Sequence, residues 1–393
     1  METADVIVIG LGAFGSATAY QLARRGAKVI GIDRFTPPHA HGSSHGETRI
    51  TRLALGEGEI YVPLVMRSHE IWAELEAQLP GRSLYRRTGG IIIGPPDGGG
   101  LLHGKRDFVQ RTIAAARRFN IPHEVLHGSA ISARFPQFVV RGDETAYCEP
   151  DTGMLRPEAC VAAHIEEARR HGAALHLDEK VVAIDGSASG ALVRTDRASY
   201  SAQQVIVTAG AWAPGLVGGA YASHLKVMRQ VLYWFKPAEP ALYSSPECPI
   251  FIWRYGDGDE DELYGFPMVD GIGGVKLGTE EYRNTTDPDH VDRAVTPAQQ
   301  QRMFESHVAG RLRGMGSECV RALTCLYTVS PDFGFVIDRH PQRENVTVVS
   351  ACSGHGFKHS AALGEQLALR ALGKETSLDW GAFSLARFGA PPA

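Results

Sequence analysis

Three glycines near the start of the chain have the spacing of a dinucleotide-binding turn. Gly10, Gly12 and Gly15 follow the apolar run 6–9, and Asp33 ends the apolar run 28–32. In a strand–turn–helix unit such glycines let the backbone approach a pyrophosphate at the helix start, and the terminal acid can bind ribose hydroxyls. An ordinary tight turn is the alternative. The complete pattern favours a bound dinucleotide, either NAD or FAD.

Basic residues in two glycine-containing loops could bind an anion. Arg49 and Arg52 lie in the glycine- and serine-rich segment 42–52, and Lys358 precedes a helix predicted over 360–369. A helix start exposes N–H groups and a partial positive charge, which suit an anion or an electron-rich ring. Two arginines in a loop are more often solvated or salt-bridged, so composition alone leaves both interpretations open.

A lysine inside an apolar strand is a further candidate. Lys276 lies in the run 275–278, and burying its charge is costly unless it has a partner or a function. The alternative is a surface lysine on an edge strand.

Hydrophobic periodicity predicts strands and helices that alternate at first and an antiparallel sheet later. We expect helices over 16–25, 63–79, 106–120 and 157–171, and strands over 6–9, 28–32, 89–94, 174–177, 181–184, 205–207, 230–235, 250–254, 263–267, 275–278, 335–338 and 346–349. Turns are expected at 256–258 and 270–271.

Composition excludes several classes of protein. A net charge of −4 over 393 residues gives no basic surface for nucleic acid, and no apolar run is long enough to span a membrane. The acidic N-terminus leads straight into a strand, so no signal peptide is expected. The six cysteines lack paired or metal-like spacing, which predicts reduced thiols in a cytoplasm and no metal site.

Two motifs carry a resemblance to a known family. Cys325-Leu326-Tyr327, followed by Ser-Gly-His-Gly-Phe-Lys over 353–358, resembles the monomeric sarcosine oxidase and N-methyltryptophan oxidase family of D-amino-acid-oxidase-like flavoproteins. The resemblance extends over nearly the whole chain. It implies FAD rather than NAD, joined covalently to Cys325, and oxidation of a secondary amino acid such as sarcosine to an imine while oxygen becomes hydrogen peroxide. It also implies a cytoplasmic monomer whose partners are its small substrate and oxygen.

The same resemblance assigns the site residues. Those implied for catalysis are Lys276, which would promote oxygen reduction, and Arg49, His45 and Tyr327. Those implied to bind substrate are Arg52, Lys358, Tyr264, Glu280 and Arg254, the first two holding its carboxylate. Those implied to bind the cofactor are Gly10, Gly12, Ala13, Phe14, Gly15, Asp33, Arg34, Ser43, Ser44, Thr48, Arg49, Val181, Ala209, Gly210, Trp212, Cys325, Gly354, His355, Gly356, Phe357 and Lys358. Buried tyrosines and a buried thiol without function are the alternatives for Tyr264, Tyr327 and Cys325.

One position departs from the family pattern. Glu280 stands where the amine oxidases of this family usually have a histidine. A carboxylate there would favour a cationic or polyhydroxylated substrate group, and the related fructosyl amino acid oxidases carry a glutamate at this spacing. An oxidase of glycated amino acids, or a dehydrogenase that uses an acceptor other than oxygen, is therefore kept as an alternative. A solvent-facing turn residue is the structural alternative for Glu280.

The expected fold is α/β, or α+β with two domains. A Rossmann-like FAD-binding domain would comprise residues 1–88, 147–215 and 325–393, and a mainly antiparallel β-sheet substrate domain residues 89–146 and 216–324.

Overall fold

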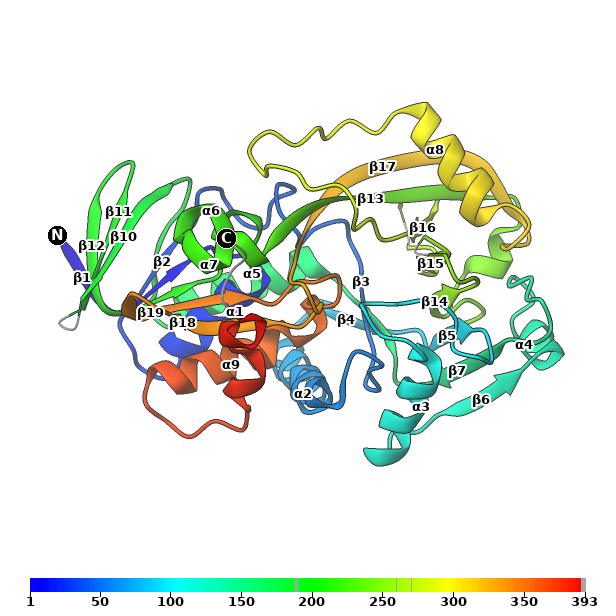
Figure 1. The fold of residues 1–393 in the computed structure, drawn as a ribbon, viewed down its shortest axis with the longest axis horizontal. Coiled ribbons are helices and arrows are strands. Elements are labelled where there is room, and N and C mark those ends of the chain that lie inside the picture. The colour runs from blue at the N-terminus through cyan, green and yellow to red at the C-terminus, as the bar shows by residue number, and fades with distance from the viewer. Residues whose placement is uncertain (188–189, 259, 270, 390–393) are drawn as a thin grey trace.

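Two large β-sheets lie towards opposite ends of the molecule (Figure 1). The structure is a computed structural model that describes residues 1–187, 190–258, 260–269 and 271–389. The predicted turn residue Asp270, and residues 390–393 of the predicted cofactor domain, lie outside the described part.

The first sheet is built around parallel strands. Its parallel strands have the order β9 (Ala174–His176), β2 (Val29–Ile32), β1 (Glu2–Ile9) and β12 (Ser199–Val207), and the end of β12 also pairs in parallel with β19 (Arg343–Ser350). Three strands pair antiparallel: β11 (Gly190–Thr195) with β12, β10 (Val181–Ser187) with β11, and β18 (Val336–His340) with β19. Val6 and Val8 belong to one hydrophobic core, and Ile7 and Ile9 to another. Burial on both faces explains why this strand reads as one continuous apolar run.

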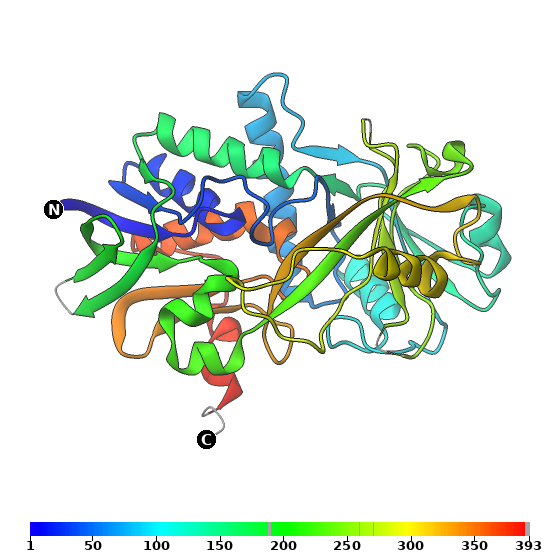
Figure 2. The same ribbon diagram turned by 90° about the horizontal axis from the view of Figure 1, so that it is seen from above.

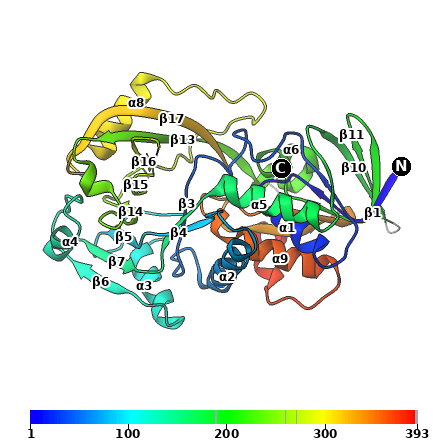
Figure 3. The ribbon, with the colours of Figure 1, turned by 180° about the vertical axis from the view of Figure 1, so that it is seen from behind.

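Helices cover both faces of this sheet (Figure 3). On one face α1 packs against α5 and α9, and α2 packs against α9; on the other lie two short helices. Their bounds are α1 (Ala13–Ala23), α2 (Val62–Gln78), α5 (Pro157–Arg170) and α9 (Ser360–Ala371), then α6 (Ala213–Val217) and α7 (Gly219–His224). The three layers give a doubly wound fold, whose ligands bind beyond the carboxyl ends of the strands.

The second sheet is antiparallel except where β14 pairs with β5. Its order is β17 (Met315–Val329), β13 (Lys226–Pro237), β16 (Val275–Gly278), β15 (Glu262–Gly265), β14 (Ile250–Arg254), β5 (Gly90–Gly94), β7 (Thr145–Glu149) and β6 (Glu124–His127). Helices α3 (Phe108–Arg118), α4 (Ser129–Arg134) and α8 (Pro297–Met303) pack against strands of this sheet. Strand β16 is therefore interior, so the edge-strand alternative for Lys276 is wrong.

Two connections hold the sheets together. The long strands β13 and β17 run from the second sheet towards the first, as the light green and gold ribbons in Figure 2 show. The second connection is a small sheet with the order β3 (Arg49–Thr51), β8 (Gly153–Leu155) and β4 (Tyr85–Arg87). Arg52 directly follows β3.

The structure confirms the predicted fold class, with one mainly parallel and one mainly antiparallel sheet. The predicted domain boundaries stay a prediction, but two of them fall inside strands. The boundary at 146/147 divides β7, and that at 324/325 divides β17. Among the described residues, every helix is too short or too polar to cross a membrane.

Helices α1 and α9 touch through a glycine, and this contact gives a stability prediction. A Cβ on Gly364 would lie 2.5 Å from Ala17 Cβ and 2.7 Å from its carbonyl carbon. Overpacking costs about 1–3 kcal/mol, so we expect Gly364→Val to lower the free energy of unfolding by that amount, measured by urea denaturation of the holoenzyme. Leu369→Val, on the same helix, is the control and should cost only a few tenths of a kcal/mol, since only helix propensity changes there. Equal losses in both variants would contradict the close contact.

Candidate active site

A cavity of about 1040 Å³ opens at the carboxyl ends of the parallel strands. Its lining includes, of the predicted cofactor-binding residues, Gly10, Gly12, Ala13, Phe14, Asp33, Arg34, Ser43, Ser44, Arg49, Val181, Ala209, Gly210, Trp212, Gly354, Gly356 and Phe357. The N-terminal loop, β10, β12 and the segment before α9 thus meet around one space, as the order of the strands requires.

The glycines of the first loop form a cradle that a side chain would fill. Gly10 has φ +88°, and a Cβ there would lie 2.7 Å from the Thr208 oxygen. A Cβ on Gly15 would lie 1.7 Å from the Gly10 oxygen, so the turn can close only with glycine at position 15. At Gly12 the nearest atom to a Cβ is Ser44 Oγ at 3.8 Å, so space is open towards the cavity. This arrangement fits an extended dinucleotide such as FAD.

Asp33 ends β2 in a position to bind a ribose. Its Oδ2 accepts the Leu11 N–H at 2.6 Å and its Oδ1 accepts the Phe35 N–H at 2.9 Å. Each oxygen keeps a free acceptor site, and the residue lines the cavity. Burial raises the pKa of Asp33 to about 6, although the two backbone hydrogen bonds oppose that rise.

Arg49 connects the cysteine of β17 to the glycine- and serine-rich loop. Its guanidinium donates to Ser43 O at 2.6 Å and to Thr48 O at 2.7 Å, and lies 3.6 Å from Cys325 Sγ. Cys325 is fully buried. The guanidinium therefore places a fixed positive charge beside the Cys325 sulfur.

Lys276 is buried rather than exposed. Its Nζ donates to Gly46 O at 2.7 Å, Thr48 O at 2.8 Å and Thr48 Oγ1 at 3.2 Å, so three acceptors surround the amine. The Nζ also lies 4.8 Å from the centre of the Phe266 ring. Burial, reinforced by the charge of Arg49, lowers the pKa of Lys276 well below its usual range.

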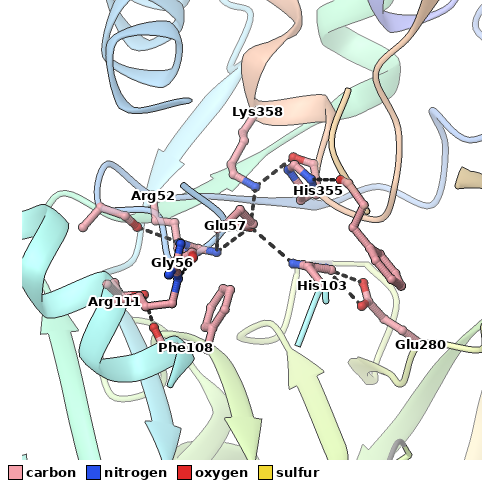
Figure 4. Close-up of polar contacts among 12 residues, drawn as sticks. Arg52, Gly56, Glu57, His103, Phe108, Arg111, Glu280, His355 and Lys358 are labelled. Atoms are coloured by element: carbon pink, nitrogen blue, oxygen red, sulfur yellow. Dashed lines mark hydrogen bonds and ion pairs between the residues drawn. The ribbon is translucent and has the colours of Figure 1, made fainter. Parts of the chain in front are cut away.

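Arg52 and Lys358 meet, as predicted, but around a carboxylate of the protein itself (Figure 4). Arg52 Nη2 lies 2.7 Å from both carboxylate oxygens of Glu57, and Lys358 Nζ lies 3.3 Å from Glu57 Oε1. All three side chains are buried. Burial alone would raise the pKa of Glu57, but Arg52 and Lys358 hold it well below its usual range. Burial lowers the pKa of Lys358 to about 8.

His103 joins Glu57 to Glu280 (Figure 4). His103 Nδ1 lies 3.4 Å from Glu57 Oε1, and Nε2 lies 3.0 Å from Glu280 Oε2, which also accepts the Tyr282 hydroxyl at 2.5 Å. Burial opposes protonation of the ring, but Glu280 and then Glu57 raise the pKa of His103 to about 10. His103 is therefore an imidazolium between two carboxylates, and the solvent-facing alternative for Glu280 is wrong.

A second cavity, of about 80 Å³, contains these charged groups. The predicted residues on its wall are Thr48, Arg49, Arg52, Tyr264, Lys276, Glu280, Tyr327, Gly354, His355, Phe357 and Lys358. Arg49, Tyr327, Gly354 and Phe357 line both cavities, so the two spaces adjoin. Burial raises the pKa of Tyr264 and Tyr327, whose hydroxyls stay protonated and can donate.

Four predicted site residues are not among the described residues that line either cavity: His45, Gly15, Arg254 and Cys325. Arg254 requires a correction, because it lies behind the wall, where its guanidinium donates to Gly258 O and pairs with Glu262 at 3.9 Å. Its charge is engaged there, away from the substrate space. His45 is buried, and burial with the charges of Arg49 and Lys276 lowers its pKa to about 3, so its ring is neutral.

Sequence reasoning did not find Glu57 and His103. Glu57 follows Arg52 closely, but an acid near an arginine in a loop is usually solvent-exposed and gives no signal. His103 lies in a glycine-rich loop before α3, and only the tertiary fold brings it beside Glu57.

Comparison with known proteins gives a consistent result. A family model described as FAD dependent oxidoreductase matches residues 5–370. The monomeric sarcosine oxidase of Streptomyces avermitilis is 38% identical over 100% of this chain and 99% of that protein, and the N-methyl-L-tryptophan oxidase of Yersinia pestis is 36% identical over 98% and 99%. The fold resembles that of NikD, an amino acid oxidase essential for nikkomycin biosynthesis, with a TM-score of 0.83 at 24% identity over 98% of each chain.

The buried imidazolium gives a pH prediction. Because the pKa of His103 rises from its ordinary value of 6.5 to about 10, its protonation stabilises the folded state fully below pH 6.5 and this contribution is lost as the pH rises through about 10. We expect the stability of wild type relative to His103→Gln, measured by urea denaturation, to be greatest near pH 6.5 and to shrink towards pH 10.

The control is His290→Gln, which removes an exposed histidine paired with Asp287 at 3.0 Å. Solvent screens that pair, so this variant should show no comparable change with pH. A wild-type advantage over His103→Gln that stays constant from pH 6.5 to 10 would show that His103 is neutral in the folded protein.

Proposed function

This chain belongs to the family of FAD dependent oxidoreductases, and we propose that it oxidises small secondary amino acids, N-methylated or cyclic, such as sarcosine. The amine loses two electrons and two protons and becomes an imine, oxygen accepts both and becomes hydrogen peroxide, and water hydrolyses the imine. FAD supplies the electron transfer when bound, while the protein binds and orients the substrate.

The observation that carries this proposal is the carboxylate held between Arg52 and Lys358. Glu57 accepts hydrogen bonds from both cations inside a cavity that adjoins the cofactor space. The two cations are thus arranged to bind a carboxylate, and a substrate carboxylate can take the place of Glu57 between them while Glu57 stays paired with His103. Such a clamp fixes the adjacent amine and C–H bond relative to the cofactor, which lowers the entropic part of the barrier.

Oxygen is the proposed electron acceptor because of Lys276. A buried amine beside the cofactor space, with backbone acceptors around it, can stabilise negative charge that develops on oxygen. A dehydrogenase that passes electrons to another acceptor has no need of a buried cation there.

We further propose that FAD is attached covalently to Cys325. The support is geometric: the Arg49 guanidinium lies 3.6 Å from the Cys325 sulfur and also donates to Ser43 O at 2.6 Å, which holds the sulfur beside a loop that lines the cofactor cavity. All six cysteines are free, which fits the proposed location in the cytoplasm. The name of the sarcosine oxidase relatives supports a monomer.

An oxidase of glycated amino acids is the second candidate. Glu280 lines the small cavity and could accept hydroxyl hydrogen bonds from a sugar. Against this, His103 and Tyr282 already occupy its oxygens, and the cavity volume of about 80 Å³ favours a small substrate. A peroxide-coupled screen across N-methyl, cyclic and glycated amino acids separates the two candidates.

Substitution of Arg52 tests the carboxylate clamp. Truncating one partner of a buried charge pair costs about 2–5 kcal/mol, so we expect Arg52→Met to lower kcat/KM for the best amino acid substrate by about 30-fold or more. The control substrate is the corresponding amine without a carboxylate, which should react slowly with wild type and be affected little by the substitution. Equal losses for both substrates would mean that Arg52 has only a structural role.

Acid precipitation tests the covalent bond. The wild-type pellet should stay yellow, and Cys325→Ser should release its flavin into the supernatant. Cys352→Ser is the matched control, because Cys352 itself lines the cofactor cavity, and its pellet should stay yellow. Yellow colour in the wild-type supernatant would show that the flavin is bound without a covalent bond.

A further inference from the structure

A carboxylate on α5 holds the loop that surrounds Lys276. Glu158 lies in the first turn of α5, and its Oε1 accepts the Gly46 N–H at 2.6 Å and the Glu47 N–H at 3.1 Å. Its Oε2 lies 3.2 Å from the same Glu47 nitrogen. Glu158 thus satisfies two consecutive backbone donors from one side of the loop.

The same loop faces Lys276 from its other side. The Gly46 carbonyl accepts the Thr48 N–H at 2.8 Å and the Lys276 ammonium at 2.7 Å. A hydrogen bond between residues two apart, with φ +69° at the central Glu47, defines a γ-turn of the rare, strained kind. A strained turn persists only when its surroundings hold it, and the two hydrogen bonds to Glu158 do so.

The turn is also packed against the second sheet. Gly46 has φ +89°, and a Cβ there would lie 2.6 Å from Leu232 Cδ1, so β13 is packed directly against the loop. If the amides of 46 and 47 lost their acceptor, the carbonyls of Gly46 and Thr48 would lose the orientation that places them around Lys276. Glu158 and Lys276 therefore bond to opposite sides of the peptide unit between residues 46 and 47. Glu158 comes from α5, which packs on the first sheet, and Lys276 comes from β16 of the second sheet.

Charge reinforces this coupling. Burial and then Arg49 lower the pKa of Lys276, whereas Cys325, Glu158 and Glu47 act in the opposite direction. Glu47 is also ion-paired with Arg321, which weakens its effect on Lys276. The charged and titratable groups that face Lys276 from the elements packed around it are Arg49, His45, Glu47, Glu158 and Cys325.

We propose that Glu158 is the positioning residue for Lys276: it holds the γ-turn whose carbonyls accept the hydrogen bonds of the lysine, and it places a carboxylate on the opposite side of that turn. This inference rests on the proposed role of Lys276 in the reaction with oxygen. Glu158 itself is not among the described residues that line either cavity.

Two substitutions separate geometry from charge. In Glu158→Gln the Oε1 can still accept both backbone N–H groups, so only the charge is lost. Glu158→Ala removes the hydrogen bonds as well. Glu166→Gln is the matched control, since Glu166 lies on the same helix but forms an exposed ion pair with Arg82.

The first measurement is a pH titration of the visible absorption of the oxidised holoenzyme. The transition that disappears in Lys276→Met belongs to the lysine. Because removal of a negative charge disfavours the ammonium, Glu158→Gln should move this transition down by about one pH unit. Glu166→Gln should leave it unchanged. A titration of Glu158→Gln that coincides with wild type would overturn the proposal.

The second measurement is the rate constant for oxygen with the photoreduced holoenzyme, which needs no amine substrate. Above the transition Glu158→Gln should be slower than wild type by about tenfold, the equivalent of one pKa unit, and should equal it at low pH. Glu158→Ala should be slower at every pH, while anaerobic reduction by substrate is unchanged in both. If Glu158→Ala matches Glu158→Gln at low pH, the turn does not depend on Glu158 and the positioning role is wrong.

The two measurements also separate this inference from the proposed function. If photoreduced wild type reacts with oxygen no faster than Lys276→Met, the oxidase proposal fails. The titration then still decides whether Glu158 controls the protonation of Lys276, because it is recorded without turnover.

Discussion

The structure depends on the mutual neutralisation of charges buried in one small space. Arg52, Glu57, Lys358, His103 and Glu280 are all buried, and any one of them alone would cost several kcal/mol to remove from water. Arg52, Lys358 and His103 all contact Glu57, and His103 also contacts Glu280, so the penalty is offset only when all are in place. Four separate stretches of chain supply these residues, which ties the assembly of the site to the packing of the two sheets.

This constraint has a direct bearing on binding. A site with Arg52 and Lys358 unpaired would expose two buried cations whenever substrate was absent, and the protein avoids this by placing its own carboxylate there. Under the proposed function, substrate would compete with Glu57, and its affinity would reflect the difference between two similar interactions. Displaced Glu57 keeps a second partner in His103, so it need not be left as an unpaired charge.

Much of this arrangement could be predicted from the sequence. The glycine turn at Gly10, the strand ending in Asp33, and the helix after Lys358 each carry a local signal, because backbone conformation and periodicity are set by nearby residues. The meeting of Arg52 and Lys358 was also predicted. Glu57, His103 and Glu158 were not found, since their roles arise from contacts between distant segments that no local pattern encodes. Arg254 was misplaced for the same reason: its contacts with Gly258 and with Glu262, which itself lines the small cavity, hold it behind the wall.

The topology of the first sheet has a consequence for biosynthesis. Strand β1 pairs with β12, and β12 in turn pairs with β19, so the sheet that begins at the N-terminus is completed only by residues near the C-terminus. Such long-range pairing slows folding. The glycine turn after β1 and residues from the end of β19 onwards line the same cavity. The cavity is therefore complete only when β19 has paired with β12. We therefore expect FAD to bind only after β19 has joined the sheet.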